Sequence, residues 1–233
     1  MIMLVLAGGF GTRLTDVVSD VPKAMAPING KPLLKLQLDN WIEQGQLDFV
    51  FLLHYQADII IKFLEEQLDI LNDAVNISWI VEESALGTGG SVANAIKQLE
   101  LSDSVLITNA DTWLDSGLKE ISRFKRTSLG TVEVTNSSRY GSIKFNNQGL
   151  ITEFVEKRND SDSSGPINAG LYKLPTNIFK RVPSKEFSLE KEILPNLVKT
   201  GDLFATRLHT NFFDIGVPDD YFRFCEWHKN LDM

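Results

Sequence analysis

Short apolar runs in the first half of the chain alternate with stretches of helical spacing, and this rhythm constrains the fold more than any other feature. Apolar runs typical of buried strands cover residues 1–7 and 49–53, and two further strands are predicted over residues 75–81 and 104–108. Between them, apolar residues recur with the period of a helix over residues 33–44, 59–68 and 91–99. Strands that alternate with helices form a parallel sheet covered on both faces. The sequence therefore predicts an α/β fold.

Glycines and carboxylates stand where three of these predicted strands end. Gly8-Gly9, Glu82-Glu83 and Asp111 each follow an apolar run. Ligands of such sheets bind beyond the carboxyl ends of the strands. We therefore expect these groups to lie at one edge of the sheet.

The second half of the chain is richer in predicted strands. They cover residues 131–135, 141–145, 151–156 and 168–174, and a hairpin turn is expected at 146–149. Helices are expected over 189–199 and 221–230. Because no convincing linker interrupts the sequence, we expect one domain over 1–233, with 1–128 and 129–233 as its two parts.

Composition narrows the classes of partner. The 233 residues carry a formal charge of −8, which argues against nucleic acid because binding to its phosphate backbone needs a basic surface. Cys225 is the only cysteine, so an intrachain disulfide is excluded, and we expect it to pack as a small hydrophobe. The N-terminal apolar run is too short to span a membrane and has no basic flank, so we expect a cytoplasmic protein without a membrane partner.

The segment LAGGFGTRL, residues 6–14, follows the first predicted strand directly. Glycines allow the backbone to approach phosphates closely, and successive N–H groups form a concave site for anions. The segment is not a P-loop, and Leu14 stands where a dinucleotide fingerprint needs its third glycine. A glycine-rich turn alone is equally typical of a purely structural connection, but Arg13 adds a fixed fork of donors for phosphate oxygens.

Lys23 lies in PKAMAPINGKPLL, residues 22–34. Most loop lysines are merely solvated. Because Pro22 restrains Lys23 shortly after the glycine-rich turn, we interpret it as a point charge for phosphate.

Together, GGFGTRL and PKAMAPINGKPLL resemble the signature of the sugar nucleotidyltransferase family, and later motifs extend the likeness over nearly the whole chain. The resemblance implies a Rossmann-like mixed sheet flanked by helices, with a smaller β-rich sugar-binding part. Residues 1–128 would mainly bind nucleotide, and 129–233 would mainly bind sugar and supply a second metal carboxylate. Arg13, Lys23, Asp111 and Asp214 would be catalytic. The nucleotide would be bound by Leu6, Ala7, Gly8, Gly9, Gly11 and Thr12.

EESALGTGGS, residues 82–91, would lie against the base by the same resemblance, with the backbone of Gly87 and Thr88 close to it. A carboxylate there suits guanine, whose edge offers two N–H donors side by side, whereas thymine and uracil offer one. Either Glu82 or Glu83 fits this role, and the sequence does not choose between them.

Asp111 and Asp214 are the metal ligands that the resemblance implies, and Mg²⁺ is the expected ion because it prefers hard oxygen ligands. Many relatives have glycine where this chain has Ala110, which leaves the carboxylate unaffected. Asp219 and Asp220 are interpreted as first-turn acids of the last helix.

The sugar contacts implied by the resemblance are Gly141, Glu156, Lys157 and Asn168. The glycine would allow close backbone approach, the glutamate and asparagine would bind hydroxyls, and the lysine would bind the sugar phosphate. Relatives commonly have proline where this chain has Arg158, so the shape of the following loop stays open.

The implied reaction transfers a nucleoside monophosphate from an NTP to a sugar 1-phosphate and releases pyrophosphate. Within the family, ALGTGGS, FSLEKEILP and FFDIGVPDDY most resemble D-glycero-α-D-manno-heptose 1-phosphate guanylyltransferases, so GTP and that sugar phosphate are favoured, with GDP-heptose as product. Transfer to mannose or glucose 1-phosphate from GTP, UTP, dTTP or CTP is the nearest alternative, and a non-catalytic nucleotide-sugar sensor is another. A dehydrogenase is disfavoured because the third glycine is missing. Whether copies of the chain assemble into a homo-oligomer stays open.

Overall fold

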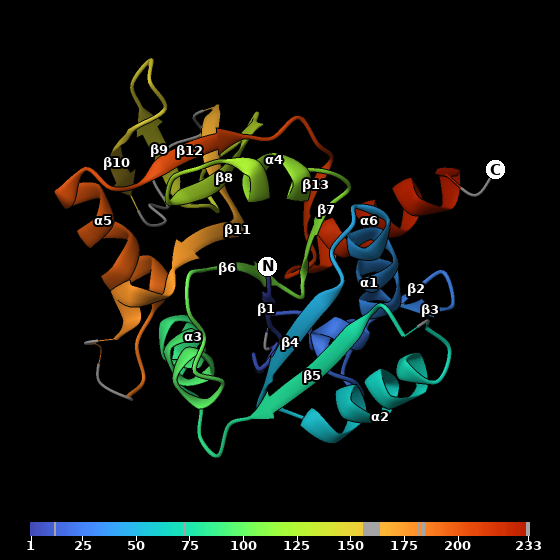
Figure 1. The fold of residues 1–233 in the computed structure, drawn as a ribbon. Coiled ribbons are helices and arrows are strands. Elements are labelled where there is room, and N and C mark those ends of the chain that lie inside the picture. The colour runs from blue at the N-terminus through green and yellow to red at the C-terminus, as the bar shows by residue number, and fades with distance from the viewer. Residues whose placement is uncertain (12, 72, 156–163, 181, 183–184, 232–233) are drawn as a thin grey trace. The chain divides into compact units, whose positions relative to one another are not determined.

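Two compact units make up the protein in the computed structural model, which describes residues 1–11, 13–71, 73–155, 164–180, 182 and 185–231 (Figure 1). The terminal unit contains Ile2–Ala85, Thr108–Asp115 and Asn211–Met233, and the central unit contains Leu86–Ile107 and Ser116–Thr210 with Met1. The contacts thus divide the chain elsewhere than at residue 128, because Leu86–Ile107 packs with the second half. Across the described ranges, no helix is long and apolar enough to cross a membrane.

The terminal unit is built on three parallel strands, β1 (Met3–Leu6), β4 (Asp48–Leu53) and β5 (Asn76–Val81). The middle strand, β4, pairs with β1 on one side and with β5 on the other, where Figure 1 shows the two strands side by side. Nearly every residue of β1 and β4 is buried, as expected for strands covered on both faces. The predicted α/β fold and parallel sheet are confirmed.

Helices and a small hairpin complete this arrangement in the terminal unit. Helix α1 spans Leu33–Glu43, and α2 spans Ala57–Leu68 and packs against β5. The short 3₁₀ turn η1 (Lys23–Met25) leads into the hairpin of β2 (Pro27–Ile28) and β3 (Lys31–Pro32). Asn29 and Gly30 both have positive φ, which suits a tight hairpin turn.

The terminal unit also contains two three-residue strands that pair with each other. The sequence analysis did not predict them. Strand β7 (Thr112–Leu114) runs antiparallel to β13 (Phe212–Asp214), and α6 (Pro218–Leu231) follows. Side chains of α1 hold β7, since Gln37 Nε2 donates to the Thr112 carbonyl at 2.6 Å. Asp219 and Asp220 lie in the first turn of α6, as expected. The apolar cluster around these strands includes Leu14, Ile28, Leu33, Leu36, Trp113, Phe213, Ile215 and Phe224.

Cys225 packs against this apolar cluster and is half-buried. Burial raises the pKa of its thiol, and hydrogen bonds from Tyr221 and from the backbone offset only part of that rise. The thiol therefore stays protonated at neutral pH, in agreement with a packing role.

The central unit contains a second set of strands in the spatial order β12 (Phe204–Arg207), β8 (Ser128–Val134), β11 (Gly165–Pro175), β9 (Ser142–Phe145) and β10 (Ile151–Val155). Strand β12 runs parallel to β8, and the other pairs are antiparallel. The expected turn between β9 and β10 is present, with Gly149 N donating to Asn146 O at 2.9 Å. The sequence analysis predicted neither β12 nor the short helix α4 (Leu118–Arg123).

Helices of the central unit are α3 (Gly87–Gln98), the short turn η2 (Thr176–Phe179), the π-helical turn η3 (Leu189–Ile193) and α5 (Leu194–Thr200). Strand β6 (Ser104–Asn109) carries the chain from the central unit into the terminal unit. Helix α3 begins at Gly87 and not at Ser91, because its glycine-rich first turns pack against another segment. A Cβ atom built on Gly89 would lie 2.1 Å from Cε2 of Phe187, and one on Gly90 would lie 2.7 Å from the Lys185 carbonyl oxygen.

We predict that Gly89→Ala lowers the free energy of unfolding by about 1–3 kcal/mol, because overpacking outweighs the better helix propensity of alanine. Phe187 cannot easily move aside, since its backbone N–H donates to Leu86 and its backbone carbonyl accepts from Gly89. Urea unfolding followed by circular dichroism measures the change. Gly9→Ala is the matched control, because a Cβ there would meet nothing within 4 Å. Equal stability of the two variants would contradict this account of α3.

Candidate active site

The glycine-rich loop leaves β1 in the terminal unit and is held by the backbone of β4 and its following turn. Ala7 N donates to Leu52 O at 3.0 Å, which extends the strand pairing past Leu6. A Cβ atom on Gly8 would lie 3.1 Å from the His54 backbone nitrogen, so only glycine fits closely here. Gly11 has a φ of +70° and accepts a hydrogen bond from Leu14 N, which closes a turn. Gly9 is exposed, and Thr12 lies outside the described residues.

Lys23 crosses the face of Gly11. A Cβ atom on Gly11 would lie 3.0 Å from Lys23 Cγ, so a larger residue at position 11 would displace the lysine stem. The Lys23 side chain is 14% exposed and its Nζ lies 3.1 Å from Asp111 Oδ2. A charge pair this poorly solvated is screened less by salt than a surface pair. The sequence-predicted phosphate lysine and first carboxylate are therefore in direct contact.

Asp214 reaches the same place through the pairing of β7 with β13. Asp214 lies opposite Thr112, and Ile215 N donates to the Asp111 carbonyl at 2.8 Å. The two aspartates, about a hundred residues apart in sequence, are thus adjacent on paired backbone segments.

Gly216 shows how tightly the charged groups surround this point. A Cβ atom built on Gly216 would lie 2.7 Å from Asp214 Oδ1. The same point is 3.1 Å from Lys23 Nζ and 3.3 Å from Arg13 Nη2. The structure therefore brings all four predicted catalytic residues together, and it adds Gly216. The sequence analysis missed that residue, although it stands inside the quoted segment FFDIGVPDDY.

The two carboxylates offer hard oxygen atoms of the kind that a divalent cation takes as ligands. Nowhere in the described ranges do three or more His, Cys, Asp or Glu side chains cluster as a complete metal cage. Mg²⁺ commonly takes one or two carboxylates from the protein and completes its octahedron with water and substrate phosphates. The donor set of Asp111 and Asp214 fits that use.

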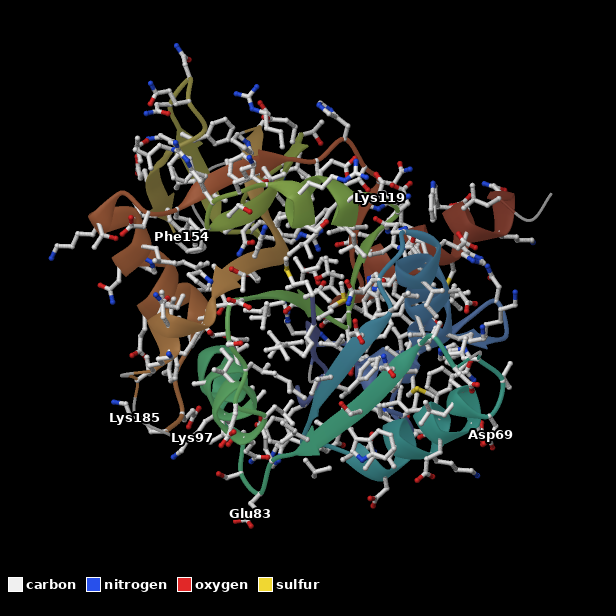
Figure 2. The ribbon with its side chains drawn as sticks, viewed as in Figure 1. Asp69, Glu83, Lys97, Lys119, Phe154 and Lys185 are labelled. Carbon is white, nitrogen blue, oxygen red and sulfur yellow. The ribbon has the colours of Figure 1, made fainter. Side chains whose placement is uncertain are left out.

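The two glutamates after β5 have different surroundings. Glu82 is 8% exposed; its N–H donates to Leu53 O, and its carbonyl oxygen lies 3.0 Å from His54 Nδ1. Glu83 is exposed, and Figure 2 shows its side chain pointing outward from the loop. The sequence analysis did not distinguish the two glutamates, but in the structure only Glu82 packs within the terminal unit.

In the central unit, the first residues of α3 are fixed by the segment before α5. Gly87 has a φ of +68°, and a Cβ atom there would lie 2.6 Å from the Phe187 carbonyl oxygen. Thr88 Oγ1 donates to Glu190 Oε2 at 2.6 Å and accepts from Leu189 N at 2.9 Å. The Thr88 side chain is therefore engaged inside the protein, which leaves its backbone for the expected contact with the base.

Two of the expected sugar contacts also meet in the central unit. Asn168 N donates to the Gly141 carbonyl at 3.0 Å, and a Cβ on Gly141 would lie 3.4 Å from Cζ of Phe154, which Figure 2 labels. Ser142 pairs with both Val155 and Ile167, so the end of β10 and the start of the Asn168 segment flank β9. Glu156 and Lys157, which follow β10 in sequence, lie outside the described residues.

The chain belongs to the nucleotidyl transferase family, whose model matches residues 2–229. The resemblance seen in the sequence motifs is thereby confirmed for almost the whole chain.

Among curated relatives, the chain is 30% identical over 223 residues to the D-glycero-α-D-manno-heptose 1-phosphate guanylyltransferase of Campylobacter jejuni, covering 95% of this chain and 97% of the relative. It is 33% identical to the mannose-1-phosphate guanylyltransferase catalytic subunit beta of Xenopus tropicalis, covering 94% of this chain but only 62% of that longer protein. The crystal structure of HddC from Yersinia pseudotuberculosis is similar at 35% identity with a TM-score of 0.84, covering 97% and 99% of the two chains. A second structure of that protein is a complex with GMP-PN.

We predict that Gly216→Ala lowers nucleotidyl transfer at least about tenfold while the protein stays folded, because the added methyl group displaces the charged groups that must be aligned. Turnover and circular dichroism measure the two effects. The control is Gly201→Ala, at a helix end where a Cβ would meet nothing within 4 Å but a φ of +74° strains alanine, so it shows how backbone strain without crowding of the charged groups affects turnover. Wild-type turnover in a folded Gly216→Ala protein would show that this crowding has no part in the chemistry.

Proposed function

We propose that this protein transfers GMP from GTP to D-glycero-α-D-manno-heptose 1-phosphate, giving GDP-heptose and pyrophosphate. The observation that carries the reaction class is the convergence of Arg13, Lys23 and Asp214 on one point beside Gly216, with Asp111 in contact with Lys23. Two cations and two carboxylates at the end of a glycine-rich loop suit the handling of phosphates and a divalent cation.

The reaction needs charge neutralisation and alignment more than proton transfer. A sugar 1-phosphate is already an anion near neutral pH, so its oxygen attacks the α-phosphorus without a general base. The bond to the β,γ-diphosphate breaks as the new P–O bond forms, and pyrophosphate carries away the bonding electron pair. Arg13 and Lys23 would offset the negative charge that gathers at the reacting phosphorus and on the leaving group.

Asp111 and Asp214 would hold Mg²⁺, which when bound neutralises phosphate charge and orients the reacting groups. In the structure Lys23 Nζ already lies 3.1 Å from the Asp111 carboxylate. Lys23 is thus suited to orient the Asp111 carboxylate until substrate phosphates arrive.

The choice of heptose rests on relatives and on the extent of the match. The guanylyltransferase named for heptose and this chain cover one another almost completely, whereas the relatives named for mannose are longer proteins of similar identity. The GMP-PN complex of HddC supports a guanine nucleotide. Mannose 1-phosphate is the second candidate substrate, because its guanylyltransferases match this chain equally well in identity.

We predict pyrophosphate release in Mg²⁺ only with GTP and the heptose phosphate, when the common nucleoside triphosphates are crossed with heptose, mannose and glucose 1-phosphates. Coupled phosphate detection after pyrophosphatase treatment measures the rate, and reactions without sugar phosphate are the control. Turnover with another pair would keep the reaction and overturn the substrate assignment. A folded protein that binds nucleotide but turns over no pair would favour a sensor.

We predict that Asp111→Asn and Asp214→Asn each lower kcat by about 10²–10³-fold with smaller changes in the two KM values, because the Mg²⁺ that these carboxylates would hold offsets charge that develops in the transition state. Steady-state kinetics at several Mg²⁺ concentrations measure this. Asp219→Asn is the matched control, since that exposed carboxylate lies in the first turn of α6. Equal kcat in all three variants would remove the aspartates from the mechanism.

A further inference from the structure

We propose that Glu190 is a positioning residue, whose carboxylate holds the Asn168 side chain and the start of α3 in their binding geometry at the same time. The inference rests on the proposed function, since it assigns a shared support to one expected sugar contact and one expected nucleotide contact. Thr88, Asn168 and Glu190 come from three separate segments of the central unit, so the fold and not sequence proximity connects them.

Three hydroxyl groups donate to the Glu190 carboxylate. Thr88 Oγ1 lies 2.6 Å and Ser188 Oγ 2.8 Å from Oε2, and the Tyr172 hydroxyl lies 3.4 Å from Oε1. An ionised carboxylate accepts hydrogen bonds only, so all three hydroxyl protons must point toward it. The direction of each bond in the network is therefore set by one charged group.

The network reaches Asn168 through Tyr172. Asn168 Nδ2 donates to the Tyr172 hydroxyl oxygen at 2.8 Å, and that oxygen can accept because its own proton is directed to Glu190. The Tyr172 side chain is 1% exposed, so its ring is locked by packing. One N–H of the Asn168 amide is thereby fixed, which orients the whole amide plane.

A bulge in β11 makes this contact geometrically available. In a regular strand, residues 168 and 172 would be about 13 Å apart at roughly 3.3 Å per residue. The pairing with β8 instead shifts register between Asn168 and Tyr172, where Gly170 has a φ of +70°. Asn168 Oδ1 accepts from Gly170 N at 2.9 Å, so the amide stabilises the bend that brings it to the tyrosine.

The same carboxylate fixes the start of α3 through Thr88. Because the Thr88 hydroxyl proton is directed at Glu190, the Thr88 oxygen is able to accept from Leu189 N, at 2.9 Å. Gly89 N meanwhile donates to the Phe187 carbonyl at 3.0 Å. The backbone of Gly87-Thr88, which is expected beside the base, is thus tied to the segment that carries Glu190.

A purely structural role is the competing explanation, because Glu190 lies in the first turn of η3, where a negative charge is favourable. That role would lower stability on mutation but leave the affinities of the folded protein unchanged. Positioning predicts a different pattern. Removing the charge of the Glu190 carboxylate should weaken the binding of both substrates. Removing the Tyr172 hydroxyl should weaken the binding of the sugar phosphate only.

The test uses Glu190→Gln and Tyr172→Phe in the full chain, with the nucleotide and sugar 1-phosphate that the wild-type protein turns over. The glutamine keeps the size of the side chain but presents an amide donor to three hydroxyls. We expect Glu190→Gln to raise the KM of both substrates about tenfold, the scale of losing a hydrogen bond to a charged group. Tyr172→Phe should raise the KM of the sugar phosphate by a similar factor and leave that of the nucleotide unchanged.

Glu192→Gln is the matched control, since it removes the same charge from an exposed position of the same turn and should change neither KM. Thermal unfolding of every variant separates stability from affinity. A lowered melting temperature with both KM values unchanged would overturn the positioning role, as would equal nucleotide and sugar effects in Tyr172→Phe. Absence of wild-type turnover with every substrate pair would overturn the proposed function itself, and the inference with it.

Discussion

The pairing of β7 with β13 is the constraint on which the candidate catalytic centre depends. Only three residues of each strand pair, yet the pairing sets Asp214 opposite Thr112 and bonds Ile215 N to the Asp111 carbonyl. So short a ladder is not stable alone. It is held by Trp113 and Phe213 in the apolar cluster and by Gln37, whose amide occupies a carbonyl of β7. Core packing therefore determines the spacing of two carboxylates that would otherwise repel each other.

Lys23 relieves that repulsion, and two glycines leave the space that it occupies. Gly11 lies against the lysine stem and Gly216 lies against its ammonium group, so a side chain at either position would compete with the lysine. The ammonium lies 3.1 Å from Asp111 Oδ2. In a chain with a formal charge of −8, Arg13 and Lys23 form a local cationic site suited to phosphate.

Much of the fold was predictable because β1 and β4 are buried on both faces and consist mainly of apolar residues. The runs at 49–53 and 75–81 correspond closely to β4 and β5. Strands β7, β12 and β13 were not predicted, since three or four residues carry no period. The start of α3 was placed too late because Gly89 and Gly90 lower helix propensity, and their benefit is close packing against residues 185–187, a tertiary contact.

The candidate site was predictable where motifs follow strands, as with Gly8 and Asp111, but not where contacts between distant segments determine a residue's partner. Asn168 was expected to bind a sugar hydroxyl, while nothing in INAGLY indicated that Gly170 bends β11 enough to bring Tyr172 to the amide. Glu190 stands in FSLEKEILP beside Glu192, and the two are indistinguishable by composition. Only the fold separates them, because Glu190 accepts from three hydroxyls, two of them from other segments, whereas Glu192 faces solvent. Candidates for binding a ligand can be proposed from local motifs, but the residues that hold such candidates in place depend on contacts that form only when the chain has folded.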